Sequence, residues 1–380
     1  MRIFQMRAFP ALLLSCIVWA CSCTESQNAY QTEIETELTF LEKARGENPD
    51  LNALLSESIL REVTGTGDIR EVLLRYLQGR EESAKEWEIQ QASIQKMTNL
   101  GETTYLEILP LVEFYASRQD LKTESAVSYL IKTDTNTILF DLGRNSENDD
   151  LSPLLHNMEK LGVSLEDVDT IVISHNHDDH TGGDAWSRQK TFSVTATQIP
   201  LGDKNVYTPV PMTYPRLESI CSTKPIRVAK GIATTGTITN QLFFLGRIEE
   251  QALAVNVSGK GIVLVAGCGH QTLSRILDRA EELFDQPIYG LVGGLHYAVT
   301  GSRGSWRGIE VHRYVGTGRL PWKPYSLDDL RHNIDILKAR KPQLVGLSPH
   351  DSCDFAISEF RETFGDAYRY VEVGKKISIN

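Results

Sequence analysis

One stretch of eleven residues, Ser174 to Asp184, constrains the fold more than any other part of the chain. It reads S-H-N-H-D-D-H-T-G-G-D and directly follows the apolar run 170–173. Such a run is typical of a buried strand, which would place the polar side chains on the turn at its C-terminal end. A polar surface turn that is rich in histidine by chance is the alternative interpretation.

The side chains in this stretch favour a metal centre. In an extended turn, His175 and His177 point the same way and can share one ion, which leaves Asp179 and His180 to face a second ion. Imidazole and carboxylate groups suit zinc, with iron and manganese close behind. The sequence therefore predicts two divalent ions as cofactors, with zinc expected and iron or manganese as alternatives.

Six further blocks of the chain accompany the histidine stretch. They are Thr137-Ile138-Leu139-Phe140-Asp141-Leu142-Gly143, Thr234-Thr235-Gly236, Glu250-Gln251-Ala252-Leu253, Gly267-Cys268-Gly269-His270, Gly293-Gly294-Leu295-His296 and Ser348-Pro349-His350. Together with the histidine stretch, this order of blocks resembles the metallo-β-lactamase fold superfamily. Within it, the blocks are similar to the branch named for dihydropterin ribofuranosyl-aminobenzene phosphate synthases. The resemblance runs from about Thr103 to the C-terminus.

The resemblance implies an α/β fold, an αββα sandwich with the metals at one edge. Because His270 and His350 also follow predicted strands, we assign His270 to the first ion with His175 and His177, and His350 to the second ion with Asp179 and His180. The chain departs from the superfamily in two places. Residues 181–269 contain no histidine, and Cys268 stands where the superfamily has a bridging aspartate. Cys268 either bridges the metals as a thiolate or lines the wall of the site.

Further roles follow from this arrangement. His296 and Asp179 are the catalytic candidates, and we expect His296 to contact the substrate or to act as a general acid; an extra metal ligand is the alternative. Asp141 would act from outside the ligand shell by hydrogen-bonding the histidine loop, as such carboxylates commonly do. A bound ion lowers the pKa of water from about 15.7 to about 7, which supplies hydroxide without a serine or cysteine nucleophile. Neither G-x-S-x-G nor a P-loop occurs in the chain.

A basic segment, residues 298–325, directly follows His296. Its five basic residues stand against one acidic residue, Glu310, in a chain whose formal net charge is −11. Arginine recognises phosphate and carboxylate in a bidentate manner, so the arginines of this segment are the substrate-binding candidates: Arg303, Arg307, Arg313 and Arg319. A solvated loop paired with acidic groups elsewhere is the alternative.

The chain of 380 residues, 41% of them hydrophobic, can bury a substantial core. Apolar residues at helical spacing predict a helical appendage over residues 31–100. From residue 103 the pattern changes to alternating strands and helices, which predicts one α/β domain over 103–380 that contains the basic segment 298–325 as an insertion. The negative net charge argues against nucleic-acid binding over the whole surface.

The N-terminus has the pattern of an export signal. Arg2 and Arg7 precede an apolar core, residues 9–20, that is too short to span a bilayer. Residues 1–22 resemble a bacterial lipoprotein signal, with Cys21 as the lipidated residue; simple secretion with cleavage near Ala20 is the alternative. We therefore expect a protein of the bacterial cell envelope, in the periplasm or facing the surface, that meets the membrane only through a lipid anchor.

These features together predict an exported metal-dependent hydrolase that cleaves a phosphoester, ester or lactone bond in a small anionic substrate. A β-lactam is possible but not favoured, because a fold does not specify a substrate. The alternatives are a non-catalytic binding or sensor protein that holds metal, and an iron-dependent redox enzyme on the same fold. The sequence does not indicate an oligomeric state.

Overall fold

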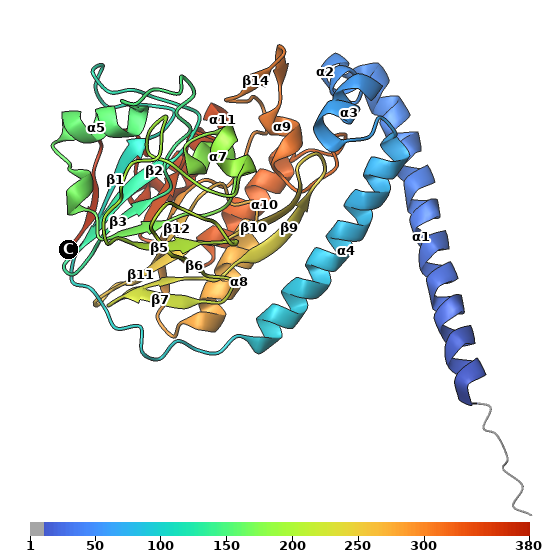
Figure 1. Ribbon diagram of the computed structural model, residues 1–380, viewed down its shortest axis with the longest axis horizontal. Helices are drawn as coiled ribbons and strands as arrows, with labels where there is room; N and C mark the ends of the chain where they lie inside the picture. The colour runs from blue at the N-terminus through green and yellow to red at the C-terminus, as the bar shows by residue number, and fades with distance from the viewer. Residues whose placement is uncertain (1–10) are drawn as a thin grey trace, which may run out of the picture. The chain divides into compact units, whose positions relative to one another are not determined.

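The computed structural model describes residues 11–380, and the side chains of residues 28–380 (Figure 1). The predicted signal segment, residues 1–22 with Cys21, lies outside the residues whose side chains are described. The chain forms two compact units, Met1–Gln78 and Gly79–Asn380. Among the residues searched, no helix has both the length and the apolar composition that crossing a membrane requires.

The smaller unit is helical. It contains α1 (Ala11–Glu47), α2 (Pro49–Leu54), α3 (Glu57–Thr64) and the first part of α4 (Ile69–Ser93). The side chain of Asn48 caps α2, and Gly65 ends α3 in the left-handed conformation that glycine adopts readily. Its core is made of leucine side chains that are 0–2% exposed: Leu41, Leu51, Leu54, Leu55, Leu60, Leu73 and Leu77.

The division between the units falls inside α4, earlier than the boundary that the sequence suggests near residue 100. The helix continues without a break, and its second part belongs to the larger unit. There Glu86 pairs with Arg247 at 2.7 Å, and the ring of Trp87 packs against the guanidinium groups of Arg275 and Arg279. These contacts explain why no linker composition marks the division.

The larger unit contains two main sheets. The first has the strand order β17-β1-β2-β3-β4-β5-β6, and the second has the order β16-β13-β12-β11-β8-β7. The strands of the first sheet are β1 (Leu106–Val112), β2 (Ser128–Thr133), β3 (Thr137–Phe140), β4 (Thr170–Val172), β5 (Asn205–Thr208), β6 (Ser219–Cys221) and β17 (Ile377–Ile379). Those of the second are β7 (Ile226–Ala229), β8 (Ile232–Thr234), β11 (Leu253–Val257), β12 (Gly261–Ala266), β13 (Ile288–Gly293) and β16 (Leu344–Leu347).

Helices cover the outer face of each sheet, and apolar side chains fill the space between the sheets. Residues such as Phe140 from the first sheet and Val265 from the second meet in the central core. On the outer side of the first sheet lies α5 (Pro153–Leu161). On the outer side of the second lie α8 (Leu273–Leu283), α10 (Leu327–Lys338) and α11 (Asp354–Phe364). The larger unit is therefore the predicted αββα sandwich (Figure 1).

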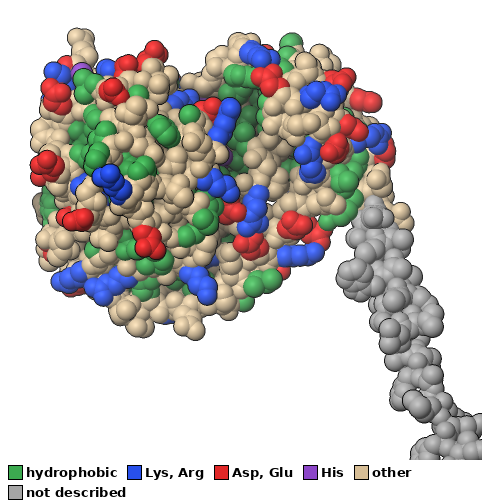
Figure 2. Space-filling view, viewed as in Figure 1, with side chains coloured by type: hydrophobic (Ala, Val, Ile, Leu, Met, Phe, Trp, Pro, Cys, Tyr) green, Lys and Arg blue, Asp and Glu red, His purple; other side chains and the backbone are tan. Residues whose placement is uncertain are grey.

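Short elements complete the unit. A hairpin pairs β9 (Ile238–Leu242) with β10 (Gly246–Glu250), and the basic segment holds β14 (Ser305–Trp306), β15 (Ile309–Glu310) and α9 (His312–Val315). The others are α6 (Asp178–Thr181), α7 (Asp184–Arg188), η1 (Leu165–Asp167) and η2 (Gly365–Ala367). On the face seen in Figure 2, basic, acidic and apolar side chains are interspersed.

Parallel pairing brings the polar turns together. Strands β3 and β4 are parallel, as are β12, β13 and β16 in the second sheet. Because the C-terminal ends of parallel strands lie at the same sheet edge, the turns after these five strands gather at one end of the sandwich. Those turns carry Asp141, the histidine stretch and the blocks that end at His270, His296 and His350.

Candidate metal centre

The histidine stretch folds as the sequence predicts, as a turn at the end of a buried strand. His177 is extended, at φ −108° and ψ 162°, and α6 begins at the next residue and carries Asp179 and His180. Helix α6 ends at Gly182, where φ is +88° and a Cβ atom would lie 1.9 Å from the carbonyl oxygen of Ser193. Only glycine fits this position, which accounts for the first glycine of the T-G-G sequence.

His175, His177 and His270 form one group of potential metal ligands. Their donor nitrogens all lie within 4.8 Å of one another. Nε2 of His175 and Nδ1 of His177 face each other at 3.1 Å. Nε2 of His270 is buried and makes no hydrogen bond among the described residues. An orphaned buried nitrogen that faces two further ring nitrogens fits a metal ion.

Asp179, His180, Cys268 and His350 form a second group with the same spacing. Sγ of Cys268 lies 3.0 Å from Nε2 of His180, 3.2 Å from Nε2 of His350 and 4.0 Å from Oδ2 of Asp179. The sulfur of Cys268 also lies within 4.8 Å of a ring nitrogen of His270 and of His296. Its sulfur therefore adjoins both groups, at the position where a bridging ligand would lie.

Hydrogen bonds orient four of the histidine rings so that Nε2 is directed to the centre. In each ring Nδ1 has a partner: Ser174 Oγ for His175 (2.9 Å), Asp141 for His180 (2.7 Å), the Gly316 carbonyl for His270 (2.7 Å) and Ser348 Oγ for His350 (2.6 Å). The two serine hydroxyls donate to Asp141 and to Glu113, so each accepts from its histidine. This is the outer hydrogen bonding typical of histidines that bind metals.

Electrostatics separates His180 from the other histidines. Burial lowers the pKa of His177 to about 4, and it lowers the pKa values of His175, His270 and His350 as well. Burial also opposes the charged form of His180, but Asp179, Cys268 and Asp141 raise its pKa well above the usual value. Neutral imidazoles are the form that binds metal, and the negative groups around His180 provide a place for a cation.

Three buried acidic residues that sequence reasoning missed hold the turns. Glu250 accepts hydrogen bonds from the backbone N–H groups of Cys268 and Gly269, at 3.0 and 2.9 Å. Glu113 accepts from the hydroxyls of Ser348 and Tyr129. Asp351, the residue after His350, is the third. Its Oδ2 accepts a hydrogen bond of 2.9 Å from the backbone N–H of His296. The position of Glu250 in one of the quoted blocks was the only sequence signal for any of them.

His296 lies beside the first group but differs from its members. Its Nε2 donates to the carbonyl of His312 at 2.8 Å, while its Nδ1 is buried and has no hydrogen-bond partner among the residues described. In the neutral ring Nδ1 is therefore an acceptor. The backbone of His296 is left-handed, at φ +55°, and a Cβ atom on Gly316 would lie 2.0 Å from its ring. This close approach explains the glycine at 316.

A pocket of about 330 Å³ opens onto both groups. Arg144, the residue after the D-x-G turn, provides a cationic side chain in its wall, with Nε 3.0 Å from Oδ2 of Asp178. That N–H makes no hydrogen bond to any residue that the structure describes. Sequence reasoning did not identify Arg144. The other lining residues are His177, Asp178, Asp179, Asp184, Ser187, Leu245, Cys268, His270, His296, Val311, His312, Val315, Gly316 and Asp351.

None of the four predicted substrate-binding arginines lines this pocket. Arg303 pairs with Asp354 at 2.6 Å, and its side chain is only 8% exposed. Arg319 makes a two-pronged ion pair with Asp329, each bond 2.8 Å long. Arg307 stacks over Trp306, and Nε of Arg313 is buried and finds no hydrogen-bond partner in the described part of the chain.

Comparison with known proteins supports the predicted resemblance. The sequence profile of the metallo-β-lactamase superfamily matches residues 121–215. A 7,8-dihydropterin-6-methyl-4-(β-D-ribofuranosyl)-aminobenzene-5′-phosphate synthase of Methanocaldococcus jannaschii is 25% identical over 241 residues, which are 53% of this chain and 80% of the relative.

Two solved structures are similar in fold. A metal-dependent hydrolase of the β-lactamase superfamily is 18% identical with a TM-score of 0.46, covering 72% of this chain and 98% of its own. The metallo-β-lactamase fold protein YhfI of Bacillus subtilis is 13% identical with a TM-score of 0.43, covering 72% and 99%.

Proposed function

We propose that this chain, whose fold is that of the metallo-β-lactamase superfamily, is a metal-dependent hydrolase of a small anionic substrate. The observation that carries the proposal is the convergence of seven donor side chains into two adjoining groups that share one pocket. Imidazole, thiolate and carboxylate donors suit zinc, and iron or manganese are the alternatives. Two ions bound there would lower the pKa of water and polarise a carbonyl or phosphoryl oxygen of the substrate.

Two residues of the pocket, His296 and Asp179, have separate roles in the proposed reaction. Nδ1 of His296 is an acceptor and is placed to take a hydrogen bond from a substrate hydroxyl. In this tautomer His296 contacts the substrate as an acceptor and becomes a general acid only when it is protonated. Asp179 lies in the second group, with its Oδ2 3.3 Å from Nε2 of His180, and its carboxylate would hold a metal ion there together with the neutral ring of His180.

Arg144 is the cationic side chain in the pocket wall, and we assign to it the binding of the anionic group of the substrate. Arg303 and Arg319 lie outside the lining of this pocket and pair with acidic residues there, which favours structural roles for them. Arg307 and Arg313 stay as further candidates. The archaeal relative is named for a product that carries a 5′-phosphate, which supports an anionic substrate.

The test is a panel of substrates given to the metal-loaded protein: a phosphodiester, a neutral aryl ester, a lactone and a β-lactam. Arg144→Gln should lower kcat/KM for the anionic substrate by about ten- to a hundredfold, because it removes a charge-assisted hydrogen bond. The neutral ester and the metal content should change little. Arg227→Gln, at an exposed position on β7, is the matched control.

The outcomes separate the proposals. An equal loss on neutral and anionic substrates would show that Arg144 acts through folding or pocket shape. Full metal occupancy with no turnover of any substrate would favour a binding or sensor protein. Iron in the purified protein together with reduction of an electron acceptor would favour the redox alternative.

We also propose that the protein is exported to the bacterial cell envelope and anchored by lipid at Cys21. This proposal depends on the sequence pattern of residues 1–22. A single acyl chain binds membranes marginally, whereas two or more chains hold a protein firmly. Cys21→Ala should therefore move the protein from the membrane fraction to the soluble or unprocessed fraction. Unchanged fractionation would show that Cys21 is not the anchor.

A further inference from the structure

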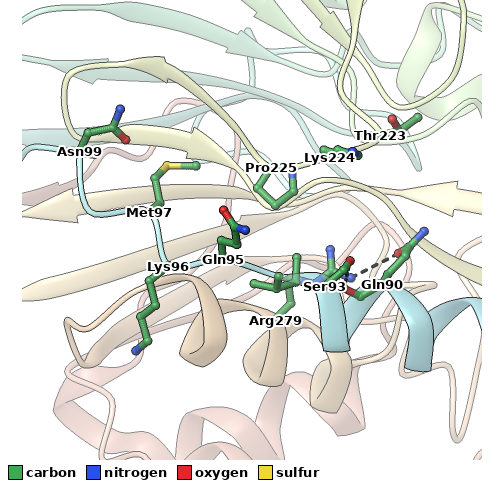
Figure 3. Close-up of a pocket in the computed structure, with 11 residues that line it drawn as sticks. Gln90, Ser93, Gln95, Lys96, Met97, Asn99, Thr223, Lys224, Pro225 and Arg279 are labelled. Atoms are coloured by element: carbon green, nitrogen blue, oxygen red, sulfur yellow. Dashed lines mark hydrogen bonds between the residues drawn. The ribbon is translucent and has the colours of Figure 1, made fainter.

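The larger unit has a second pocket, of about 610 Å³, that shares no residue with the pocket at the metal centre. Figure 3 shows Thr223, Lys224 and Pro225 on one wall and Gln90, Ser93 and Arg279 on the other. The remaining lining residues come from the segment that follows α4: Ile94, Gln95, Lys96, Met97 and Asn99. The pocket therefore joins α4, α8 and the turn before β7.

The lining of this pocket is positive. It includes three basic residues and no acidic residue. Lys96 has a counter-charge, because its Nζ lies 2.7 Å from Oδ1 of Asp285. The ammonium group of Lys224 makes no ion pair or hydrogen bond within the described part of the chain. Two of the three positive charges, those of Lys224 and Arg279, thus have no carboxylate partner.

Arg279 is the unusual member, because its side chain is buried and the residue is only 1% exposed. Its guanidinium donates to Oε1 of Gln91 at 2.9 Å, to the carbonyl of Thr235 at 3.0 Å and to Oε1 of Gln90 at 3.3 Å. All three acceptors are neutral. Burial lowers the pKa of Arg279 to about 10, and no acidic group opposes that effect. Buried charges are ordinarily paired, so this guanidinium lacks a counter-ion.

A second arginine on the same helix adds to the positive field. Arg275 precedes Arg279 by one turn, and the guanidinium of each lies 5.2 Å from the ring centroid of Trp87. Arg275 donates to the carbonyl of Thr239, and it has no ion pair within the described residues. The indole of Trp87 therefore contacts two guanidinium groups, one of which faces the pocket.

We propose that this pocket binds a small organic dianion, such as a phosphate monoester, at a site separate from the metal centre. Two negative charges match the two uncompensated positive charges of Arg279 and Lys224. The hydroxyl of Thr223 and the side-chain amides of Gln95 and Asn99 can donate further hydrogen bonds to phosphate oxygens. The apolar side chains of Ile94, Met97 and Pro225 provide a surface for the organic part of the ligand.

Trp87 makes the proposal measurable. Phenyl phosphate, with inorganic phosphate as a second probe, would be titrated into the metal-loaded full-length protein at constant ionic strength, and tryptophan fluorescence followed. We expect a saturable change, because an anion at Arg279 alters the field at the indole ring. Trp87→Phe should remove that change without removing binding as seen by calorimetry.

Lys224→Glu tests the charge of the site without disturbing the core. It should weaken the binding that Trp87 reports by about tenfold or more. Lys260→Glu, on the exposed turn between β11 and β12, makes the same charge change outside the pocket and should leave binding unaltered. Arg279→Lys, which keeps the charge but loses the fork of donors, should also weaken binding; a thermal melt would check that it is folded.

The metal centre itself could bind phosphate, and the variants distinguish the two sites. Binding at the metals would persist in Lys224→Glu and would not depend on Trp87. If all binding behaves in that way, or if Lys224→Glu and Lys260→Glu lose affinity equally, the proposal is wrong and Arg279 is a structural residue only.

Discussion

Nδ1 of His180 donates a hydrogen bond of 2.7 Å to Oδ2 of Asp141, and both side chains are fully buried. The same carboxylate accepts hydrogen bonds from the backbone N–H and the hydroxyl of Ser174, each at 2.7 Å. Asp141 thereby fixes the ring of His180 so that Nε2 faces Cys268, and it anchors the start of the histidine turn. Its backbone lies in the left-handed region, at φ +60°, which aims the side chain inward.

Asp141→Asn should weaken metal binding by about ten- to a hundredfold, because outer-shell carboxylates orient and strengthen their histidine ligands. The second group should lose its ion first, since His180 belongs to it. Titration with a competing chelator measures the two affinities. Asp120→Asn, an exposed carboxylate paired with Arg118, is the control. Unaltered affinities would reduce Asp141 to a structural turn residue.

Cys268 adjoins both ligand groups, so its replacement tests the bridge directly. Cys268→Ala should sharply lower occupancy of the second group. Cys268→Asp should restore much of it, because a carboxylate can also bridge two ions. Metal analysis of the three proteins decides the question. Full metal and full activity in both variants would make Cys268 a wall residue.

Gly294 allows the turn after β13 to approach His350. A Cβ atom at this position would lie 2.2 Å from the carbonyl oxygen of Gly267, 2.5 Å from Oδ2 of Asp351 and 2.6 Å from Cε1 of His350. Gly294→Ala should therefore displace both side chains and lower metal occupancy of the second group more than that of the first. Gly301→Ala, at a position with open space around it, should have no such effect. Equal occupancy in the two variants would contradict this packing argument.

Glu113 should make stability depend on pH. Burial raises its pKa from 4.5 to about 7, so the folded protein holds this proton more tightly than the unfolded chain does. The contribution is complete below about pH 4.5 and is lost as the pH rises through about 7, a loss of about 3 kcal/mol. Denaturant unfolding in the presence of a chelator, over pH 4.5–8, measures it. Glu113→Gln should reduce this slope without abolishing it, because burial also raises the pKa of Glu250 to about 7; an identical slope in the variant would assign the pH dependence to other groups.

The sequence predicted the parts of the centre whose signal is local. The histidine turn, the D-x-G turn and the turns ending at His270 and His350 each follow an apolar strand, and parallel pairing then gathers them. The superfamily resemblance and the αββα sandwich are confirmed. The ligand roles of individual residues and the predicted extent of the helical appendage stay predictions.

Other features of the centre depend on long-range contacts and have no local signal. Glu113 meets Ser348 across 235 positions of sequence, and Glu250 holds backbone N–H groups 18 and 19 residues later. Arg303 stands in a conspicuously basic segment, but its partner Asp354 lies beyond that segment. The concentration of basic residues in segment 298–325 therefore did not reveal which arginine lines the pocket. Arg144, which lies outside that segment, was missed.

The central claim, that two groups hold two ions, is tested most directly by counting metal. Purified wild-type protein and His175→Ala/His177→Ala would be compared by elemental analysis after dialysis. We predict about two equivalents in the wild type and about one in the variant, with no hydrolysis by the variant, because only the second group keeps its ligands. Full retention of both ions in the variant would contradict the account and place the ligands elsewhere.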